Sequence, residues 1–270
     1  NNIWFFSQLK PIYSYVIEGA NNALNYIKKE IQSEPSTAID IRDIALRFSC
    51  DVSANSILAI DAKSFSTKSP EILELLKKMI KGIVDSNLSL FPKKLIPKEH
   101  EDNFIELMTN AINLRIENKS NRKDFLAHIV AVKQQKGQTR DEAAAHGWTF
   151  FLDSFETTAD VVNHAFYEIA MHQRVQDKLR EEIMDNLNED GLMNYDKITD
   201  LVYLDQVFFE VLRLHPPFMF TTKVCSEDIE LEGYKGHKYV MKKGSTALIS
   251  MHSIHRDPGE VKISSYKLTF

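Results

Sequence analysis

This sequence has few of the residues that break helices, make tight turns or form disulfides. Its 270 residues include 9 glycines and 8 prolines, a scarcity that disfavours a β-sandwich or barrel and favours helices. It has only 2 cysteines, Cys50 and Cys225, too few for the disulfide framework of a small secreted domain. Both stand in apolar stretches, so we expect small buried thiols there.

The sequence also lacks the signals of a membrane span, a signal peptide and a nucleic-acid-binding surface. No stretch reaches the roughly eighteen consecutive apolar residues of a transmembrane helix. A net charge of -5 leaves no basic surface for nucleic acid. We therefore expect the 270 residues by themselves to be soluble and to have no nucleic-acid partner.

Metal-binding and phosphate-binding patterns are missing as well. Neither Glu-x-x-His nor His-Glu-x-x-His occurs, which disfavours a di-iron bundle and a zinc protease. No glycine-rich loop of the phosphate-binding kind is present. The nine histidines therefore predict no metal site.

What the sequence does contain is helical periodicity through its first 214 residues or so. Apolar spacing predicts helices over 9–31, 40–60, 70–85, 101–117, 122–134, 139–171, 173–186, 195–201 and 203–214, with an irregular linker at 91–97. Short β-prone pieces separated by glycine turns follow at 218–225, 229–231, 238–241 and 245–250. The sequence thus predicts a mainly α fold with a small β-sheet near the C-terminus.

The longest predicted helix carries the first motif. A capping box, Thr139 with Glu142, starts the helix, and its centre is apolar nearly all round, so we expect it to be buried. Glu156 and Thr157 stand within this apolar stretch, where a carboxylate and a hydroxyl need partners. A threonine that bonds to the carbonyl one turn earlier bends a helix and can open a groove. By itself this motif more often marks a kinked helix with a surface glutamate.

The second motif is Glu210 and Arg213, an i, i+3 pair followed at once by the sequence Leu214-His215-Pro216-Pro217. On an exposed helix such an ion pair contributes less than about 1 kcal/mol. The rest of this helix is apolar, however, and the prolines end it abruptly. We therefore expect the pair to lie in a mostly buried site.

Together, in this order and about fifty residues apart, the two motifs resemble the oxygen-activating helix and the Glu-x-x-Arg helix of the cytochrome P450 superfamily. Residues 41–45, 61–65, 122–126 and 251–258 are also similar to segments of its animal and insect microsomal members. The resemblance covers 1–258, which we expect to form a partial cytochrome P450 domain, and leaves 259–270 as a divergent tail. It implies a mainly α fold of the cytochrome P450 kind.

The resemblance also implies residue roles around a haem. Glu156 and Thr157 would be catalytic and deliver protons to bound oxygen. Ser154, Thr157 and Lys223 would lie against the cofactor, Ser154 where the family has glycine and Lys223 where it usually has an arginine that reaches a haem propionate. A solvated lysine on an edge strand is an equally good interpretation of Lys223.

For Glu210 and Arg213 the resemblance implies a structural ion pair that anchors the loop beneath the haem. In the family this pair is completed by a distant arginine, which has no counterpart in this sequence. We therefore expect the pair to be present but incompletely satisfied.

The family's Phe-x-x-Gly-x-Arg-x-Cys loop, which carries the iron ligand, is absent, and neither Cys50 nor Cys225 stands in such a loop. The family's membrane anchor is absent too. We therefore expect an internal fragment, catalytically silent by itself, of a haem-dependent monooxygenase. The intact parent would insert oxygen from dioxygen into an apolar small molecule, with electrons from an NADPH-dependent reductase, at the cytosolic face of the endoplasmic reticulum membrane. The alternatives are a non-enzymatic truncated remnant without haem and a helical interaction module.

Overall fold

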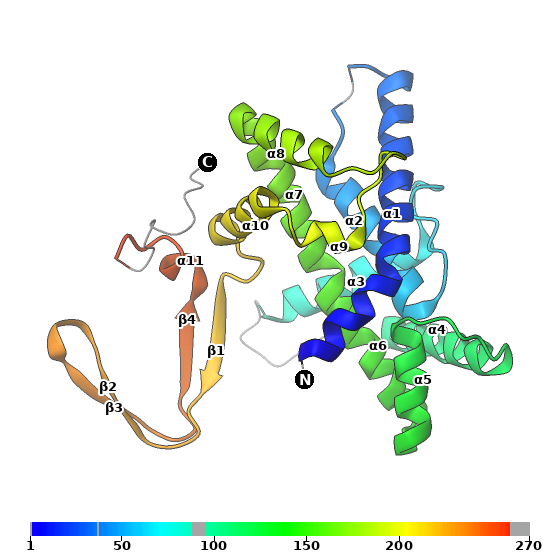
Figure 1. Cartoon of the computed structure of the whole chain (residues 1–270). Coiled ribbons are helices and arrows are strands. Elements are labelled where there is room, and N and C mark those ends of the chain that lie inside the picture. Colours follow the sequence, from blue (N-terminus) through cyan, green and yellow to red (C-terminus); the bar gives the residue numbers. More distant parts are fainter. Residues whose placement is uncertain (1, 37, 88–95, 260–270) are drawn as a thin grey trace. The chain divides into compact units, whose positions relative to one another are not determined.

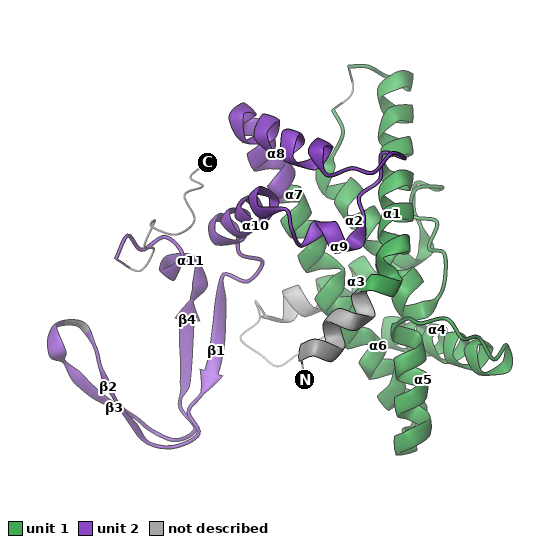
Figure 2. Cartoon of the chain, viewed as in Figure 1, with its two compact units in different colours: residues 1–163 green, residues 164–270 purple. Residues whose placement is uncertain are grey.

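A computed structural model describes residues 2–36, 38–87 and 96–259 (Figure 1). The chain is mainly helical, with short antiparallel strands near its C-terminus, which confirms the predicted fold class. It divides into two compact units, Asn1–Asn163 and His164–Phe270, coloured separately in Figure 2. Most of the linker predicted at 91–97, and all of the predicted tail beyond Gly259, lie outside the described residues.

The first unit is built from helices. They are α1 (Asn2–Ser33), α2 (Ile41–Ser53), the π-helical turn η1 (Ala54–Leu58), α3 (Glu71–Asn87), α4 (Lys98–Glu117), α5 (Phe125–Lys136), α6 (Arg140–Ser154) and the first half of α7 (Glu156–Met171). Side chains from η1 and from α2 to α7 form one hydrophobic core, in which Phe151 and Phe155 are completely buried. Phe104 meets Phe151 edge-on, with ring centroids 5.7 Å apart.

At several helix ends, local groups satisfy the free backbone groups. The capping box is confirmed: the hydroxyl of Thr139 accepts from the backbone N–H of Glu142, whose carboxylate accepts from the N–H of Thr139. Gly137 ends α5 with a positive φ of 62°, a conformation that glycine adopts without steric cost. Asp40 caps α2 by accepting from the N–H groups of Arg42 and Asp43.

The single helix predicted over 139–171 is wrong in one respect. Two helices occupy this stretch, and Phe155 separates α6 from α7. Phe155 has φ -83° and ψ -72°, so its carbonyl is turned away from the usual helical direction. Its N–H still bonds to the carbonyl of Phe151 at 2.9 Å, and its own carbonyl accepts from Ala159 at 3.1 Å. The chain therefore stays helical on both sides of a one-residue interruption, called the junction below.

A buried arginine fixes the segment between η1 and α3. Arg47 of α2 is only 6% exposed, and its guanidinium donates to the carbonyls of Thr67 at 2.9 Å and Lys68 at 3.0 Å, and also to that of Ser64. Its Nε contacts the Asp43 carboxylate at 2.6 Å. One planar group with several donors thus holds an irregular loop against the helices.

The second unit continues with α8 (Gln173–Asp185), α9 (Tyr195–Ile198) and α10 (Val202–Leu214). The strands β1 (Phe220–Val224) and β4 (Thr246–Ser250) pair antiparallel, as do β2 (Ile229–Glu232) and β3 (Lys238–Met241). The 3₁₀ turn η2 (Tyr234–Gly236) lies between β2 and β3, and the short helix α11 (Met251–Ile254) follows β4. The predicted small sheet therefore consists, among the described residues, of two strand pairs.

Two carboxylates join the helices of this unit. The buried Glu168 of α7 contacts Nε2 of His215, directly after α10, at 2.6 Å. Glu182 of α8 accepts from the N–H groups of Tyr203 and Leu204 at 2.8 Å each and so caps the start of α10. These contacts fix both ends of the helix that carries Glu210 and Arg213. No helix in the described part of the chain is both long and apolar enough to cross a bilayer.

Candidate functional site

Three of the residues that the sequence singles out flank the junction: Ser154 ends α6, and Glu156 and Thr157 begin α7. The hydroxyl of Thr157 donates to the carbonyl oxygen of Asp153, four residues earlier, at 2.6 Å. This is the back-bond to the previous turn that the sequence predicts for a threonine in a bent helix. Because this bond uses the only proton of the hydroxyl, the lone pairs of Oγ1 remain able to accept another hydrogen bond.

Two serines from α2 contact the same junction, and sequence reasoning missed both. The hydroxyl of Ser49 lies 2.8 Å from the carbonyl oxygen of Phe155 and 3.2 Å from that of Ser154. The hydroxyl of Ser53 lies 2.9 Å from the hydroxyl of Ser154. About a hundred residues separate these partners along the chain, so no local sequence signal could have found them.

Glu156 opens α7 and forms an ion pair with Arg42, a further residue that sequence reasoning missed. The Glu156 side chain is 29% exposed, and that of Arg42 is 50% exposed. We expected Glu156 and Thr157 to lie in the interior, but both residues are only half-buried. A carboxylate in the first turn of a helix is favoured by the helix dipole, and here it has a cationic partner as well.

Chemically, this arrangement places a carboxylate and a hydroxyl next to each other where the backbone is irregular. A carboxylate can take up and release a proton, and a hydroxyl can donate and accept one. The carbonyl of Asp153 accepts a hydrogen bond from the Thr157 hydroxyl, and the carbonyls of Ser154 and Phe155 share one from the Ser49 hydroxyl. The junction therefore has the groups needed to pass a proton to a molecule bound beside it.

Glu210 and Arg213 of α10 form the ion pair that the second motif predicts. Nε and one terminal nitrogen of Arg213 contact the two carboxylate oxygens of Glu210 at 2.7 and 2.8 Å. The Glu210 side chain is 10% exposed, and these hydrogen bonds raise the pKa of the Arg213 guanidinium. The pair is better satisfied than expected, because Arg213 also donates to the carbonyl of His255 at 2.9 Å. A backbone carbonyl near the C-terminus of the unit thus takes one of the remaining donors.

Lys223 lies on β1, opposite Ala247 of β4, and is exposed. The two motifs fall in different units: Ser154, Glu156 and Thr157 in the first, and Glu210 and Arg213 in the second with Lys223. Within the second unit, Lys223 lies on a strand and the ion pair on a helix.

Neither cysteine fits the role of an axial ligand to haem iron, which requires a thiolate. Cys50 is completely buried in α2, and burial raises the pKa of its thiol to about 12. Cys225 is half-buried, not buried as expected, and its thiol donates to the carbonyl of Glu227 at 2.8 Å. The part of the chain that the structure describes also contains no cluster of His, Cys, Asp or Glu suited to a metal ion. Neither Cys50 nor Cys225 is therefore suited to supply a thiolate ligand for haem iron.

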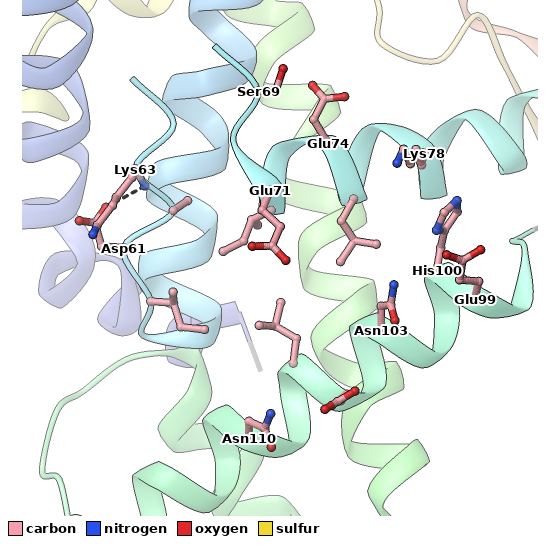
Figure 3. Close-up of a pocket in the computed structure, with 16 residues that line it drawn as sticks. Asp61, Lys63, Ser69, Glu71, Glu74, Lys78, Glu99, His100, Asn103 and Asn110 are labelled. Atoms are coloured by element: carbon pink, nitrogen blue, oxygen red, sulfur yellow. Dashed lines mark hydrogen bonds between the residues drawn. The ribbon is translucent and has the colours of Figure 1, made fainter. Parts of the chain in front are cut away.

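Two cavities of the first unit differ in character. A cavity of about 910 Å³ between α3, α4 and the loop after η1 is lined by several carboxylates, such as Glu71, Glu74 and Glu99, together with His100 (Figure 3). Its lining combines these charged groups with apolar side chains such as Ile72, Leu75 and Leu107. A cavity of about 400 Å³ has a mainly apolar lining and adjoins the junction at Ser154.

Comparison with known proteins identifies the family. The family model for Cytochrome P450 matches residues 2–260. Over 93% of its length, the chain is 30% identical to probable cytochrome P450 309a1 and 30% identical to cytochrome P450 6a9, both of Drosophila melanogaster. It is 29% identical to cytochrome P450 6A1 of Musca domestica, over the same share.

The chain therefore belongs to the cytochrome P450 family, as the two motifs indicated. Its relatives are insect proteins, in agreement with the expected animal and insect type. The chain spans about half the length of the curated relatives it matches, 52% and 53% of the first and second of those named. Membership of the family implies haem as the cofactor of the intact protein.

Proposed function

We propose that this sequence forms part of a haem-dependent monooxygenase that inserts one oxygen atom of dioxygen into an apolar small molecule. The observation that carries the proposal is the junction, where Glu156 and Thr157 lie at an interrupted helix in a chain of the cytochrome P450 family. When bound, haem supplies the oxygen and electron chemistry. What this chain's own residues supply is the handling of protons.

In this proposal, Glu156 and Thr157 are the catalytic residues. Thr157 accepts a hydrogen bond through the free lone pairs of Oγ1, while its own hydroxyl remains hydrogen-bonded to the carbonyl of Asp153. Glu156 exchanges protons with solvent, which its partial exposure permits, and Arg42 holds the carboxylate beside the junction. A positioned acid–base group of this kind contributes about 10²–10⁴-fold to a rate.

The other predicted site residues have supporting roles. Glu210 and Arg213 hold the second unit together around α10, since the arginine joins the helix to the carbonyl of His255. Ser154 and Lys223 lie against the cofactor in this proposal, Ser154 beside Thr157 and Lys223 as a positive charge for a propionate. The exposure of Lys223 leaves its ammonium group available for such a partner.

The proposal extends to partners and location, for which the resemblance to the family is the support. The intact protein receives its electrons from an NADPH-dependent reductase and works on an apolar substrate at the cytosolic face of the endoplasmic reticulum membrane. The resemblance to microsomal members and the insect relatives support this part of the proposal.

The 270-residue chain by itself is catalytically silent in this proposal. The observation that supports it is chemical: the thiol of Cys50 is enclosed and has a pKa of about 12, and that of Cys225 is bonded to a backbone carbonyl. The second candidate, a truncated remnant without haem and without turnover, is favoured by the same two observations.

The test compares the 270-residue chain with a full-length product of the same gene. Each is mixed with haem, reduced and exposed to carbon monoxide, and product formation is measured with a reductase. We expect the thiolate-type red-shifted band and turnover from the full-length product only. A thiolate band from the 270-residue chain would contradict its silence. A full-length product with neither band nor turnover would contradict the monooxygenase proposal and leave the remnant.

A further inference from the structure

The serines Ser49 and Ser53 of α2 both face the α6–α7 junction. They are four residues apart, about one helical turn, so their side chains lie on the same face of α2. Both are almost completely buried, with 2% and 3% of their surface exposed. Buried hydroxyls need hydrogen-bond partners, and these two find theirs at the junction.

The bonds from Ser49 fall on the carbonyls that the interruption leaves irregular. In a regular α-helix each carbonyl accepts from the N–H group four residues later. At the junction, the carbonyls of Ser154 and Phe155 accept instead, or in addition, from the Ser49 hydroxyl. A hydroxyl has one proton, so the two distances, 3.2 and 2.8 Å, describe one shared hydrogen bond. An inserted donor of this kind is a recognised cause of a helix kink.

Ser53 acts on the side chain of the same segment. Its hydroxyl pairs with that of Ser154 at 2.9 Å and directs the Ser154 side chain toward α2. Ser154 stands where the family has a glycine, and its extra atoms would otherwise be free to turn into the groove at the junction. With Arg42 bonded to Glu156, α2 therefore contacts the junction at three places.

We propose that Ser49 and Ser53 are positioning residues, which hold the α6–α7 junction open and so set the positions of Glu156 and Thr157. The inference rests on the proposed function, because it gives α2 a part in the same proton delivery. Ser49 holds the backbone, and Ser53 holds the Ser154 side chain. Neither serine reacts or touches substrate.

The variants are Ser49→Ala, Ser49→Thr and the matched control Ser56→Ala. Ser56 is a serine 4% exposed on η1 that lines the same 400 Å³ cavity, but its hydroxyl bonds only to the carbonyls of Val52 and Ser53, away from the junction. Ser49→Thr keeps the hydroxyl, and the cavity beside Ser49 has room for the added methyl group. The pair of alanine variants thus separates loss of the junction bond from loss of a buried serine hydroxyl.

The first measurement is amide hydrogen exchange over residues 152–162, which needs neither haem nor turnover. Without the Ser49 hydroxyl, the carbonyl of Ser154 takes the N–H of Thr158 and the helix becomes regular. We expect exchange there to slow about fivefold in Ser49→Ala, the effect of about one net hydrogen bond, and to stay unchanged in Ser56→Ala. Unchanged exchange in Ser49→Ala overturns the proposal. Faster exchange also overturns it, since Ser49 would then merely fasten the helices together.

The second measurement uses the haem-loaded full-length protein and compares product formed per NADPH consumed. We expect this ratio to fall about fivefold in Ser49→Ala, because proton delivery loses its alignment, and to stay near the original value in Ser49→Thr and Ser56→Ala. An unchanged ratio in Ser49→Ala overturns the proposal even where exchange slows. If the parent protein shows neither thiolate band nor turnover, the proposed function is contradicted instead. The exchange result then still decides whether Ser49 holds the junction open.

Discussion

Arg213 and Glu210 form a bidentate ion pair within one helix, with nitrogen–oxygen distances of 2.7 and 2.8 Å. The carboxylate is 10% exposed, so its removal from water is compensated mainly by this one guanidinium. Arg42 and Glu156 form the other ion pair of interest, and there the side chains are 50% and 29% exposed. The two pairs should therefore contribute very differently to stability.

We predict that Arg213→Gln lowers the free energy of unfolding by about 3 kcal/mol, because it leaves the buried Glu210 carboxylate without its cation. The matched change Arg42→Gln should cost less than about 1 kcal/mol, since that pair is screened by solvent. Chemical denaturation of both variants measures the difference. A loss of only about half a kcal/mol in Arg213→Gln would mean that the pair is an ordinary surface contact.

The second prediction concerns the Thr157 hydroxyl. We expect Thr157→Val in the haem-loaded full-length protein to lower product formed per NADPH at least about tenfold, because the hydroxyl that accepts a hydrogen bond at the junction is gone. Thr149→Val is the control, since Thr149 of α6 makes the same bond to a carbonyl four residues earlier, Ala145 at 3.0 Å, away from the junction. Equal losses in the two variants would assign the effect to helix geometry alone.

These residues also show how far the sequence alone could lead. The helix boundaries at Thr139 and Gly137 were predictable, because a capping box and an αL glycine are local signals. The Thr157 back-bond and the Glu210–Arg213 pair were predictable for the same reason, since both join residues within one helical turn.

The interruption at Phe155 was not predictable in that way. The hydroxyl of Ser49 and the charge of Arg42 reach the junction from more than a hundred residues earlier, and only the tertiary fold brings them there. The carbonyl of His255, which completes the surroundings of Arg213, is likewise 42 residues away. Local periodicity identified the helix, and distant polar groups determine where it breaks.

The two thiols should react at very different rates. Cys50 is enclosed in the core, and its pKa of about 12 leaves almost no thiolate near pH 8, whereas Cys225 is half-buried. We predict that a thiol-alkylating reagent modifies one cysteine of the folded chain and both cysteines of the unfolded chain. Mass spectrometry of the digested protein locates the label. Rapid labelling of Cys50 in the folded chain would show that the core around α2 opens readily.

Burial of Cys50 also predicts a dependence of stability on alkaline pH. The folded pKa of about 12 lies above the value near 9 of an exposed thiol, so the unfolded state releases the proton first. The contribution of the neutral thiol is then fully present below pH 9 and decreases by up to about 1.4 kcal/mol per pH unit between pH 9 and pH 12. Cys50→Ala should remove this part of the slope. Denaturation curves between pH 8 and about pH 10.5 measure it, and equal slopes in the two proteins would contradict the prediction.

The last prediction concerns Arg47, whose guanidinium joins α2 to the loop before α3. It donates to three carbonyls of that loop and contacts Asp43, while 6% of the residue is exposed. Lysine keeps the charge but replaces the planar fork by one ammonium group, so it cannot reach all three carbonyls. We expect Arg47→Lys to lower the free energy of unfolding by about 2–3 kcal/mol, because buried carbonyls lose their hydrogen-bond donors. We also expect limited proteolysis to cut within residues 61–69.

Arg42→Lys is the matched control for this change. Arg42 is on the same helix and forms one exposed ion pair, which lysine can replace, so stability and the proteolytic pattern should stay the same. The contrast isolates the geometry of the donor from its charge. Arg47→Lys could instead unfold at the same temperature as the original protein and leave residues 61–69 resistant to protease. The loop would then be held by its apolar contacts and not by the arginine; one such contact joins the rings of Phe65 and Tyr26, whose centroids are 5.6 Å apart.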